Sequence, residues 1–220
     1  MSEAARDLYY LLNRGYPKKS SLQLVGSRYR LTKTELALLG RCVHEEEYNL
    51  SVARKLEVGS SAKLLVVDVY NVLTSVSEYL EGGKLYLCTD LVIRDIASAE
   101  GRSRKTREAL LRAASRLSEA LGSTNVEALI FVLDERRSRS AELAASLRKL
   151  PWPVAEARFL LSQKADSSII EKCSEEPERA AATSDRVVLE RVEAARDLVR
   201  LVVEHEGGFE KILDLRDLVL

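Results

Sequence analysis

The stretch KLLVVDVYNVL, residues 63–73, decides the fold of this chain, because an apolar run ends at Asp68 and a second apolar pattern follows directly. Three more runs end in the same way: KLYLCTD at Asp90, ALIFVLD at Asp134 and AAATSD at Asp185. Short apolar runs that alternate with helix-length patterns are typical of an α/β domain with a parallel sheet. We therefore predict an α/β fold around these runs.

The boundaries of the expected elements follow from the apolar patterns and from Gly, Pro and capping residues. We predict strands over 64–68, 85–89, 128–133, 154–159, 180–183 and 199–203, with a short one near 212–215. We predict helices over about 103–121, 138–149, 166–173 and 186–197, and leave 71–80 open between a helix and an irregular turn.

The first 62 residues have a different texture and read as a small helical module. An amphipathic pattern predicts a helix over 2–14, and Gly15 and Pro17 end it. Thr32 and Glu35 stand at capping-box spacing and predict a helix over about 33–44. The polar segment 44–62 reads as a joint. We call residues 1–62 the N-terminal module and residues 63–220 the α/β domain.

Composition limits the classes of protein to consider. Of the 220 residues, 46% are hydrophobic and 31% are charged, and no apolar run reaches the length of a membrane span. The first residues, MSEAARDLYY, lack a signal-type apolar core, so we expect a cytoplasmic protein without a membrane partner. Cys42, Cys88 and Cys173 form no CxxC pair, which argues against a zinc site or a disulfide framework. The two histidines, His44 and His205, disfavour a His-based site.

The zero net charge hides an asymmetry between the two parts. Residues 1–44 carry eight basic and three acidic residues, so the rest of the chain carries a net charge of −5. A basic appendage beside an acidic domain suits an enzyme that acts on a polyanion.

The strand-end aspartates are the candidate catalytic residues. The carboxyl ends of parallel strands share one edge of the sheet, where ligands bind. Asp68, Asp134 and Asp185 would meet there, joined by Asp166, which opens the segment DSSIIEKC. Clustered carboxylates repel one another unless a cation offsets their charge, and an all-oxygen set suits Mg²⁺ or Mn²⁺. The alternative is that each aspartate is an ordinary turn or N-cap residue.

Other polar residues are candidates for substrate binding, each with a structural alternative. Asn71 can reach the same cleft as Asp68, and the segment CTDLVIRDIAS adds Asp90 and Asp95 with Arg94 between them. Arg94 could hold a phosphate bidentately or could pair with a neighbouring carboxylate.

Two more candidates lie outside these strand ends. Ser138 or Ser140 would cap the helix after Asp134 and place its N-terminus near a phosphate, or would cap an ordinary helix. Arg28 and Arg30 stand near tyrosines that either stack on unpaired bases or seal the joint between the two parts.

At these residues the chain resembles the PIN and NYN-type ribonuclease superfamily. The resemblance rests on Asp68-x-x-Asn71, Asp134, Asp166 and the closing Thr183-Ser184-Asp185, and it covers about 63–200. It is closest to an archaeal and bacterial family that pairs such a domain with a basic N-terminal module, which the stretch LLNRGYPKKSSLQLVGSRYRL also resembles. The chain departs from the superfamily in having Val69 after the first Asp and only Glu78 as a candidate for the helix acid.

The resemblance implies a three-layer α/β/α fold with a mostly parallel PIN-like sheet. It also implies Mg²⁺ or Mn²⁺ bound by Asp68, Asp166 and Asp185, and RNA as the substrate; a homodimer is left open. The first hypothesis is thus a metal-dependent endoribonuclease. The second is a non-catalytic RNA-binding or adaptor protein that keeps the fold, and a phosphatase is disfavoured because DVYN lacks the DxD nucleophile motif.

Overall fold

Four parallel strands form the central sheet of the computed structural model, which describes residues 1–97, 105–176 and 178–219. The strands are β1 (Leu64–Asp68), β4 (Ala128–Asp134), β5 (Glu156–Ser162) and β6 (Arg179–Ala182), in the order β5-β4-β1-β6. β1 lies inside the sheet, and Leu65, Val66 and Val67 are fully buried. Continuous apolar runs of this kind are expected for strands covered on both faces.

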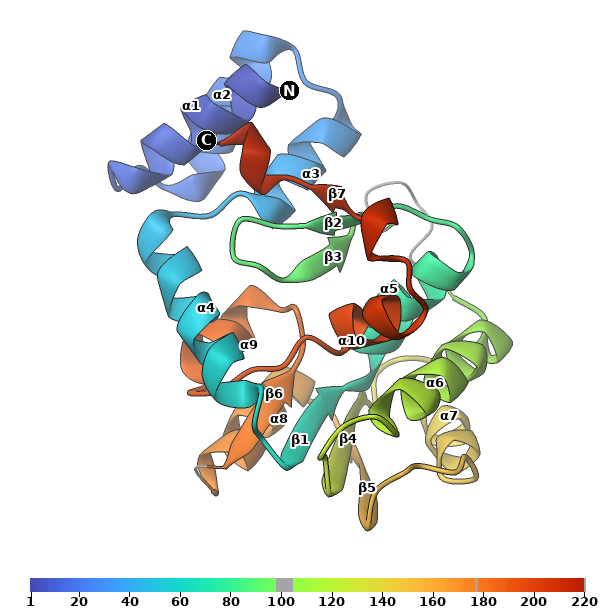
Figure 1. The fold of residues 1–220 in the computed structure, drawn as a ribbon. Coiled ribbons are helices and arrows are strands. Elements are labelled where there is room, and N and C mark those ends of the chain that lie inside the picture. The colour runs from blue at the N-terminus through green and yellow to red at the C-terminus, as the bar shows by residue number, and fades with distance from the viewer. Residues whose placement is uncertain (98–104, 177, 220) are drawn as a thin grey trace.

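Helices cover both faces of this sheet and make three layers (Figure 1). Helices α8 (Ala165–Ser174) and α9 (Arg186–Arg191) pack against Val66, Ile130 and Val132 on one face. The other face packs Leu65, Val67 and their neighbours against four helices: α5 (Val69–Leu80), α6 (Arg107–Leu121), α7 (Ser140–Leu147) and α10 (Leu198–His205). The predicted α/β/α fold with a parallel sheet is confirmed.

A small second sheet lies beyond the carboxyl ends of the strands. It has the order β3-β2-β7, with β2 (Leu85–Leu87) antiparallel to β3 (Ile93–Asp95) and parallel to β7 (Leu213–Asp214). This sheet stands between the central sheet and the N-terminal helices (Figure 1).

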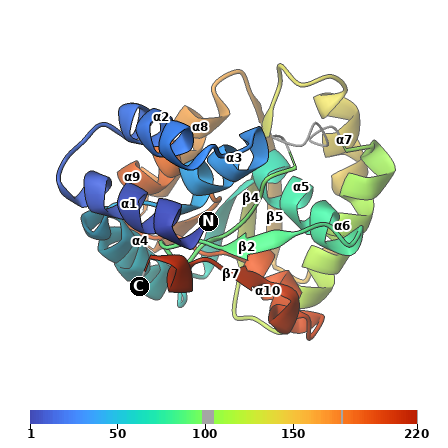
Figure 2. The same ribbon diagram turned by 90° about the horizontal axis from the view of Figure 1, so that it is seen from above.

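The N-terminal module is helical, as predicted. Its helices are α1 (Ser2–Asn13), α2 (Lys18–Tyr29), α3 (Lys33–Cys42) and α4 (Glu46–Gly59). The capping box of Thr32 and Glu35 is present at the start of α3. Figure 2 looks onto these helices from above, and α1, α2 and α3 share a core of Ala5, Leu8 and Leu39.

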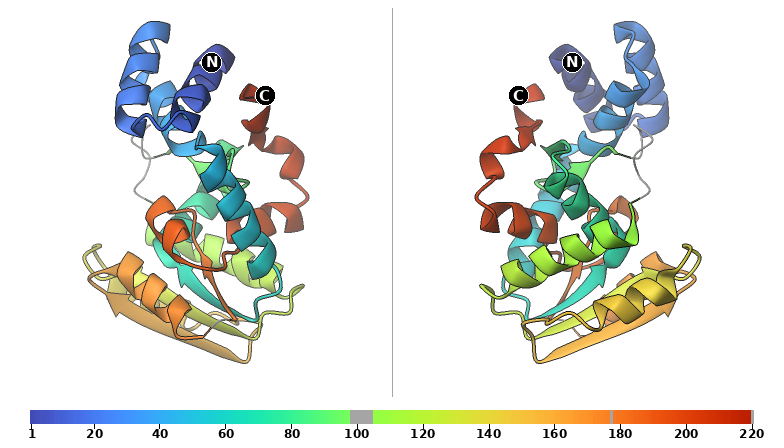
Figure 3. Two further views of the ribbon diagram at one scale, coloured as in Figure 1. Left: turned by 90° about the vertical axis from the view of Figure 1, so that its left-hand side faces the viewer. Right: turned by 90° about the vertical axis from the view of Figure 1, so that its right-hand side faces the viewer.

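The two ends of the chain lie at the same end of the molecule (Figure 3). After α10, the chain runs through the 3-10 turn η1 (Phe209–Lys211) and β7 to the turn η2 (Arg216–Leu218), which contacts α1. Leu218 and Val219 pack against the core of the N-terminal module. The C-terminal tail therefore covers the N-terminal module although the sequence places it in the α/β domain.

Several predicted elements differ from the structure. The strand expected over 199–203 is helix α10, because the side chain of Asp197 caps its first turn and Leu198, Val199, Val202 and Val203 form one buried helical face. The joint expected at 44–62 contains helix α4, and the helix expected over 186–197 ends at Arg191. Strand β3 was not predicted. Residues 103 and 104, the expected start of the helix at 103–121, lie outside the described residues.

A disulfide joins the N-terminal module to the α/β domain. Cys42, the last residue of α3, is bonded to Cys88, the residue after β2, and Cys173 is free and buried. Cysteine spacing argued against a disulfide framework, and this pairing instead arises from tertiary contact over a sequence separation of 46 residues. No described helix has the length and apolar character needed to cross a bilayer.

Candidate active site

A polar cavity of about 380 Å³ opens at the edge where the strands of the central sheet end. It is lined by the following residues: Arg41, Asp68, Tyr70, Asn71, Thr74, Asp95, Asp134, Arg137, Ala165, Asp166 and Asp185. All four predicted catalytic aspartates are among them, and Asp95 adds a fifth carboxylate. We call this cavity the aspartate pocket.

Asp68 ends β1 and is the N-cap of α5, so it belongs to a strand and a helix at once. Its Oδ1 accepts a hydrogen bond from the backbone N–H of Asn71 at 3.2 Å, and its Oδ2 accepts one from the hydroxyl of Thr183 at 3.1 Å. Burial raises the pKa of Asp68 to about 6, the nearby charges of Asp166 and Asp185 add to the rise, and the two hydrogen bonds oppose it. Among the described residues, hydrogen bonds but no cationic side chain stabilise the ionised carboxylate of Asp68.

Asp166 and Asp185 come from two helices on the same face of the sheet. Asp166 lies in the first turn of α8 and its side chain is exposed. Partial desolvation of its carboxyl raises its pKa, and the charges of Asp185 and Asp134 raise it further. Asp185 caps α9 through Oδ1, which accepts hydrogen bonds from the N–H groups of Val187 and Val188. The N-cap alternative therefore holds for Asp185 without removing it from the pocket.

The side chain of Asn71, just after β1, is hydrogen-bonded to Ser184, just after β6. Its Oδ1 accepts hydrogen bonds from the backbone N–H of Ser184 at 2.8 Å and from the Ser184 hydroxyl at 2.9 Å. Thr183, next to Ser184, donates to Asp68 and accepts from the N–H of Asp185 at 3.1 Å. These bonds set the spacing between Asp68 and Asp185 across 117 positions of sequence.

The two remaining carboxylates already have protein partners. Arg136 donates to both oxygens of Asp134, at 3.0 and 3.1 Å, and this contact lowers the pKa of Asp134. Asp95 is buried, and it accepts hydrogen bonds from the hydroxyl of Ser75 at 2.5 Å and from the N–H of Ala97 at 2.9 Å. Asp134 and Asp95 are therefore less available for a new ligand than Asp68.

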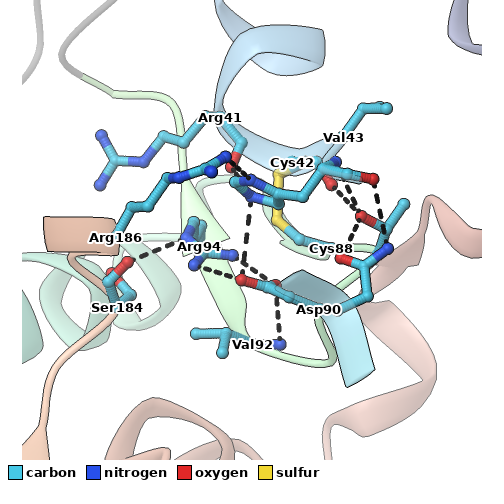
Figure 4. A network of polar contacts seen from close by, with 12 residues as sticks. Arg41, Cys42, Val43, Cys88, Asp90, Val92, Arg94, Ser184 and Arg186 are labelled. Atoms are coloured by element: carbon cyan, nitrogen blue, oxygen red, sulfur yellow. Dashed lines mark hydrogen bonds and ion pairs between the residues drawn. A yellow bond between two sulfur atoms is a disulfide. The ribbon is translucent and has the colours of Figure 1, made fainter. Parts of the chain in front are cut away.

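Arg94 and Asp90 lie outside the aspartate pocket and pair with each other (Figure 4). Both Arg94 Nη atoms donate to the carboxylate of Asp90 at 2.6 Å, and Arg94 Nε donates to the carbonyl of Ser184 at 3.0 Å. Arg94 is 2% exposed and Asp90 is fully buried. The geometry matches the ion-pair alternative for Arg94 and leaves no room for a phosphate there.

The predicted helix start after Asp134 differs in detail. Helix α7 begins at Ser140 behind Arg139, and no side chain caps it. Ser140 is buried; its hydroxyl donates to the carbonyl of Asp134 at 2.5 Å and contacts the hydroxyl of Tyr70 at 2.7 Å. Ser140 is therefore occupied by structural bonds, whereas Ser138 is exposed.

Ser138 lines a second cavity, of about 920 Å³, that shares Tyr70, Thr74 and Arg137 with the aspartate pocket. Its basic lining residues are Lys105, Arg107, Arg136, Arg137 and Arg139. Arg137 lies over the ring of Tyr70, 4.5 Å from its centroid. We call this cavity the basic groove, and it continues directly from the acidic one.

Arg28 and Arg30 are exposed at the end of α2 and line neither cavity. Tyr29, between them, donates its hydroxyl to Asp7 at 2.7 Å and packs against the core of the N-terminal module. Tyr29 therefore packs on the core of α1, α2 and α3, and the role expected for the tyrosines at the joint between the two parts stays a prediction.

Thr74, Tyr70 and Arg41 line the pocket although they were not singled out from the sequence. Thr74 follows Asn71 by three positions, so helical periodicity could have placed it on the same face. Tyr70 follows Asp68 by two residues and carried no separate signal. Arg41 was counted only as part of the basic segment, because nothing in its local pattern connects it with a site in another part of the chain.

The donor set of the pocket suits a hard divalent cation. The carboxylates of Asp68, Asp166 and Asp185 supply only oxygen, and Asp68 has a raised pKa that a nearby cation would relieve. Across 1–97, 105–176 and 178–219, no three His, Cys, Asp or Glu side chains stand close enough together to hold a metal ion. Binding would thus require rearrangement of these side chains, among which Asp166 is exposed.

Comparisons with known proteins divide the chain near the end of α4. Residues 59–201 match the family described as Domain of unknown function (DUF5616), and residues 1–55 match Protein of unknown function (DUF434). Uncharacterized protein MJ0935 from Methanocaldococcus jannaschii is 30% identical over 211 residues, which cover 93% of this chain and 97% of that protein. No solved structure matches the chain. The chain belongs to the DUF5616 family.

Proposed function

We propose that this protein is a metal-dependent endoribonuclease of the PIN and NYN type. The observation that carries the proposal is the gathering of five aspartates at the carboxyl edge of a parallel sheet, next to a groove lined by five basic residues. An acidic pocket alone would repel a nucleic acid. An adjoining basic groove offers contacts for the phosphates of a strand whose reacting phosphate lies over the acids.

The three proposed metal ligands have the chemistry that the reaction needs. Asp68, Asp166 and Asp185 would hold the cation, and a bound Mg²⁺ or Mn²⁺ would polarise the phosphate and lower the pKa of a water molecule. Asn71 and Thr183 orient this set through their hydrogen bonds. Asp134 stays ionised beside Arg136 and faces the pocket, where it can accept a hydrogen bond from the attacking water.

The basic groove supplies the positioning. Arg136, Arg137 and Arg139 are exposed along the loop between β4 and α7. Arg136 is paired with Asp134, and Lys105 and Arg107 near the start of α6 contact glutamates. These three residues therefore add less free charge than Arg137 and Arg139. A strand bound along this loop would have its backbone phosphates next to the pocket, which orients the scissile bond before any chemistry.

The test is cleavage of a mixed RNA pool and a matched DNA pool with Mg²⁺, with Mn²⁺ and with EDTA. We expect cleavage of RNA with a divalent ion and its loss in Asp68→Asn, which keeps the shape of the side chain and removes its charge. Asp217→Asn is the matched control, because Asp217 is exposed and lines neither cavity. Equal cutting by the wild type and Asp68→Asn would exclude Asp68 from the reaction.

The adaptor alternative has one observation in its favour, the lack of a ready-made metal arrangement among the described side chains. It makes the opposite forecast in the same experiment. A non-catalytic protein would bind RNA through the basic groove and cut nothing with either ion, and Asp68→Asn would bind RNA as well as the wild type or better.

A further inference from the structure

Arg41 brings a positive charge from the N-terminal module to the aspartate pocket. It lies in the last turn of α3 and lines the pocket together with Asp68, Asp95, Asp166 and Asp185. Its side chain is half-buried, and Figure 4 shows its guanidinium directed away from the network of polar contacts around Arg94. Arg41 belongs to the segment 1–55, whereas every aspartate that lines the cavity belongs to the segment 59–201.

The guanidinium of Arg41 makes no hydrogen bond or ion pair with the rest of the described chain, although carboxylates line the same cavity. Arg137, the other arginine of the pocket, lies over the ring of Tyr70, and three arginines nearby are paired with carboxylates. Arg94 binds Asp90, Arg136 binds Asp134, and Arg186 binds Glu45 and Glu190. A half-buried arginine has lost part of its hydration, so an unpaired one at a cavity is suited to an incoming anion.

The backbone that carries Arg41 is held in place on several sides. The carbonyl of Arg41 accepts a hydrogen bond from His44 Nε2 at 3.0 Å, and burial lowers the pKa of His44 to about 3, so the ring stays neutral. Cys42 is bonded to Cys88, and the carbonyl of Val43 accepts a hydrogen bond from Lys18 at 2.8 Å. The end of α3 is therefore preorganised for binding.

The same network reaches Ser184 and Arg186, the two neighbours in sequence of the proposed metal ligand Asp185 (Figure 4). The N–H of His44 donates to Thr89, which precedes Asp90, and the partner of Asp90, Arg94, donates to the carbonyl of Ser184. On the other side of Asp185, Arg186 contacts His44 Nδ1 at 3.2 Å and pairs with Glu45. The backbone of Arg41 and the two neighbours of Asp185 are thus held by one set of buried and partly buried contacts that crosses from the N-terminal module to the α/β domain.

We propose that Arg41 is a substrate-binding residue that contacts the phosphate of a nucleic-acid strand in the aspartate pocket. The proposal rests on the proposed function, since it names the group that would hold the reacting phosphate. A guanidinium can donate two parallel hydrogen bonds to a phosphate, which lysine cannot do. It also offsets charge in a pocket where five carboxylates would otherwise repel the substrate. The N-terminal module is then part of the active site.

The experiment compares wild type, Arg41→Gln, Arg41→Lys and the control Arg54→Gln. Arg54 is an exposed arginine on α4 of the same module and lines neither cavity. For each protein, kcat/KM for a short single-stranded RNA is measured with Mn²⁺, the affinity for the same RNA is measured in EDTA, and Tm is recorded. We expect Arg41→Gln to lose about tenfold or more in kcat/KM and in affinity. Arg41→Lys should recover part of the loss, and Tm should stay near that of the wild type.

The two proposals fail in different ways. If the wild type cuts RNA and Arg41→Gln cuts and binds equally well, the role of Arg41 is wrong and the nuclease stands. If the wild type fails to cleave RNA with every divalent ion tested, the nuclease proposal is wrong. The RNA affinities measured in EDTA then decide whether Arg41 binds the strand. Weaker RNA binding by Arg41→Gln, together with normal binding by Arg54→Gln, supports the proposed role of Arg41. Equal affinities, or no measurable RNA binding by the wild type, overturn it.

Discussion

The side-chain oxygen of Asn71 accepts two hydrogen bonds from Ser184, one from its N–H at 2.8 Å and one from its hydroxyl at 2.9 Å. This contact joins the first turn of α5 to the loop after β6. Asp68 is the N-cap of α5, and Asp185 ends that loop. The contact explains why an asparagine stands three residues after the strand-end aspartate. The two bonds fix the spacing of the carboxylates, and Asn71 also lines the aspartate pocket.

Asn71→Ala should weaken divalent-ion binding and RNA cleavage by about 10–100-fold, the usual cost of removing a residue that orients metal ligands. It should also lower stability by about 1–3 kcal/mol, because the N–H of Ser184 loses its partner. Calorimetric titration with Mn²⁺ and urea unfolding measure the two effects. Asn125→Ala, at an exposed position, is the control. Unchanged Mn²⁺ affinity would show that the loops keep their spacing without this bond.

The raised pKa of Asp68 predicts how metal-free stability depends on pH. The folded protein holds a proton on Asp68 up to about pH 6, whereas an unfolded aspartate loses it near pH 4. Between these values the folded state binds more protons, so this residue's contribution to stability falls as pH rises from about 4 to 6 and is constant above. The size of this contribution should stay below the full ~1.4 kcal/mol per pKa unit, because the side chain keeps some contact with solvent.

The test compares the unfolding of the wild type and of Asp68→Asn in EDTA across this pH range. Asp68→Asn should be more stable than the wild type above pH 6 and about equally stable near pH 4. Added Mn²⁺ should stabilise the wild type more as pH rises through 6, since the ion competes with the proton. A wild type whose stability relative to Asp68→Asn does not change with pH would show that Asp68 is ionised throughout.

Arg94→Met should destabilise the protein by about 3–5 kcal/mol, because it leaves Asp90 buried and unpaired. The double variant Asp90→Asn with Arg94→Met should lose less than Arg94→Met alone. RNA affinity, measured at a temperature where all three proteins are folded, should change little. An Arg94→Met protein of normal stability with weakened RNA binding would instead restore the phosphate-binding role considered for Arg94 from the sequence.

Replacing Arg28 by Gln and Arg30 by Asn should reduce the salt dependence of RNA binding if α2 contacts the strand. Asparagine is chosen for Arg30 because that residue has a φ of 51°. Each lost phosphate contact lowers the slope of log affinity against log salt by about 0.7 for a single strand. The matched control is Arg54→Gln with Lys149→Gln, at exposed positions. Equal slopes would show that the end of α2 faces solvent in the complex.

Point substitutions are needed here because removing residues 1–44 would disturb the fold. Leu38 and Cys42 of α3 pack against Tyr86, Cys88 and Leu215 of the α/β domain. A truncated chain would expose this cluster and lose the disulfide, so a loss of RNA binding could not be assigned to charge.

The sequence by itself determined the class of fold and four of the five aspartates that line the pocket. Apolar runs such as 64–68 and 128–134 read correctly as strands, because strands buried on both faces are apolar throughout. Strand-end aspartates could be expected to converge, because all parallel strands end at one edge. The run at 199–203 was misread, because a short apolar segment has the same composition in a buried helix as in a strand.

Only the tertiary structure decided which charged residues are free to act. The sequence left Arg94 open between a phosphate and a neighbouring carboxylate, and it connected Arg41 with no site. In the structure Asp90 neutralises Arg94 in the interior, whereas Arg41 stands unpaired at the pocket among the described residues. The pairing of Cys42 with Cys88 and the return of the C-terminal tail to α1 are likewise contacts between distant segments. Local pattern reports which face of an element is apolar, but the partner of a charge is set by how the elements pack.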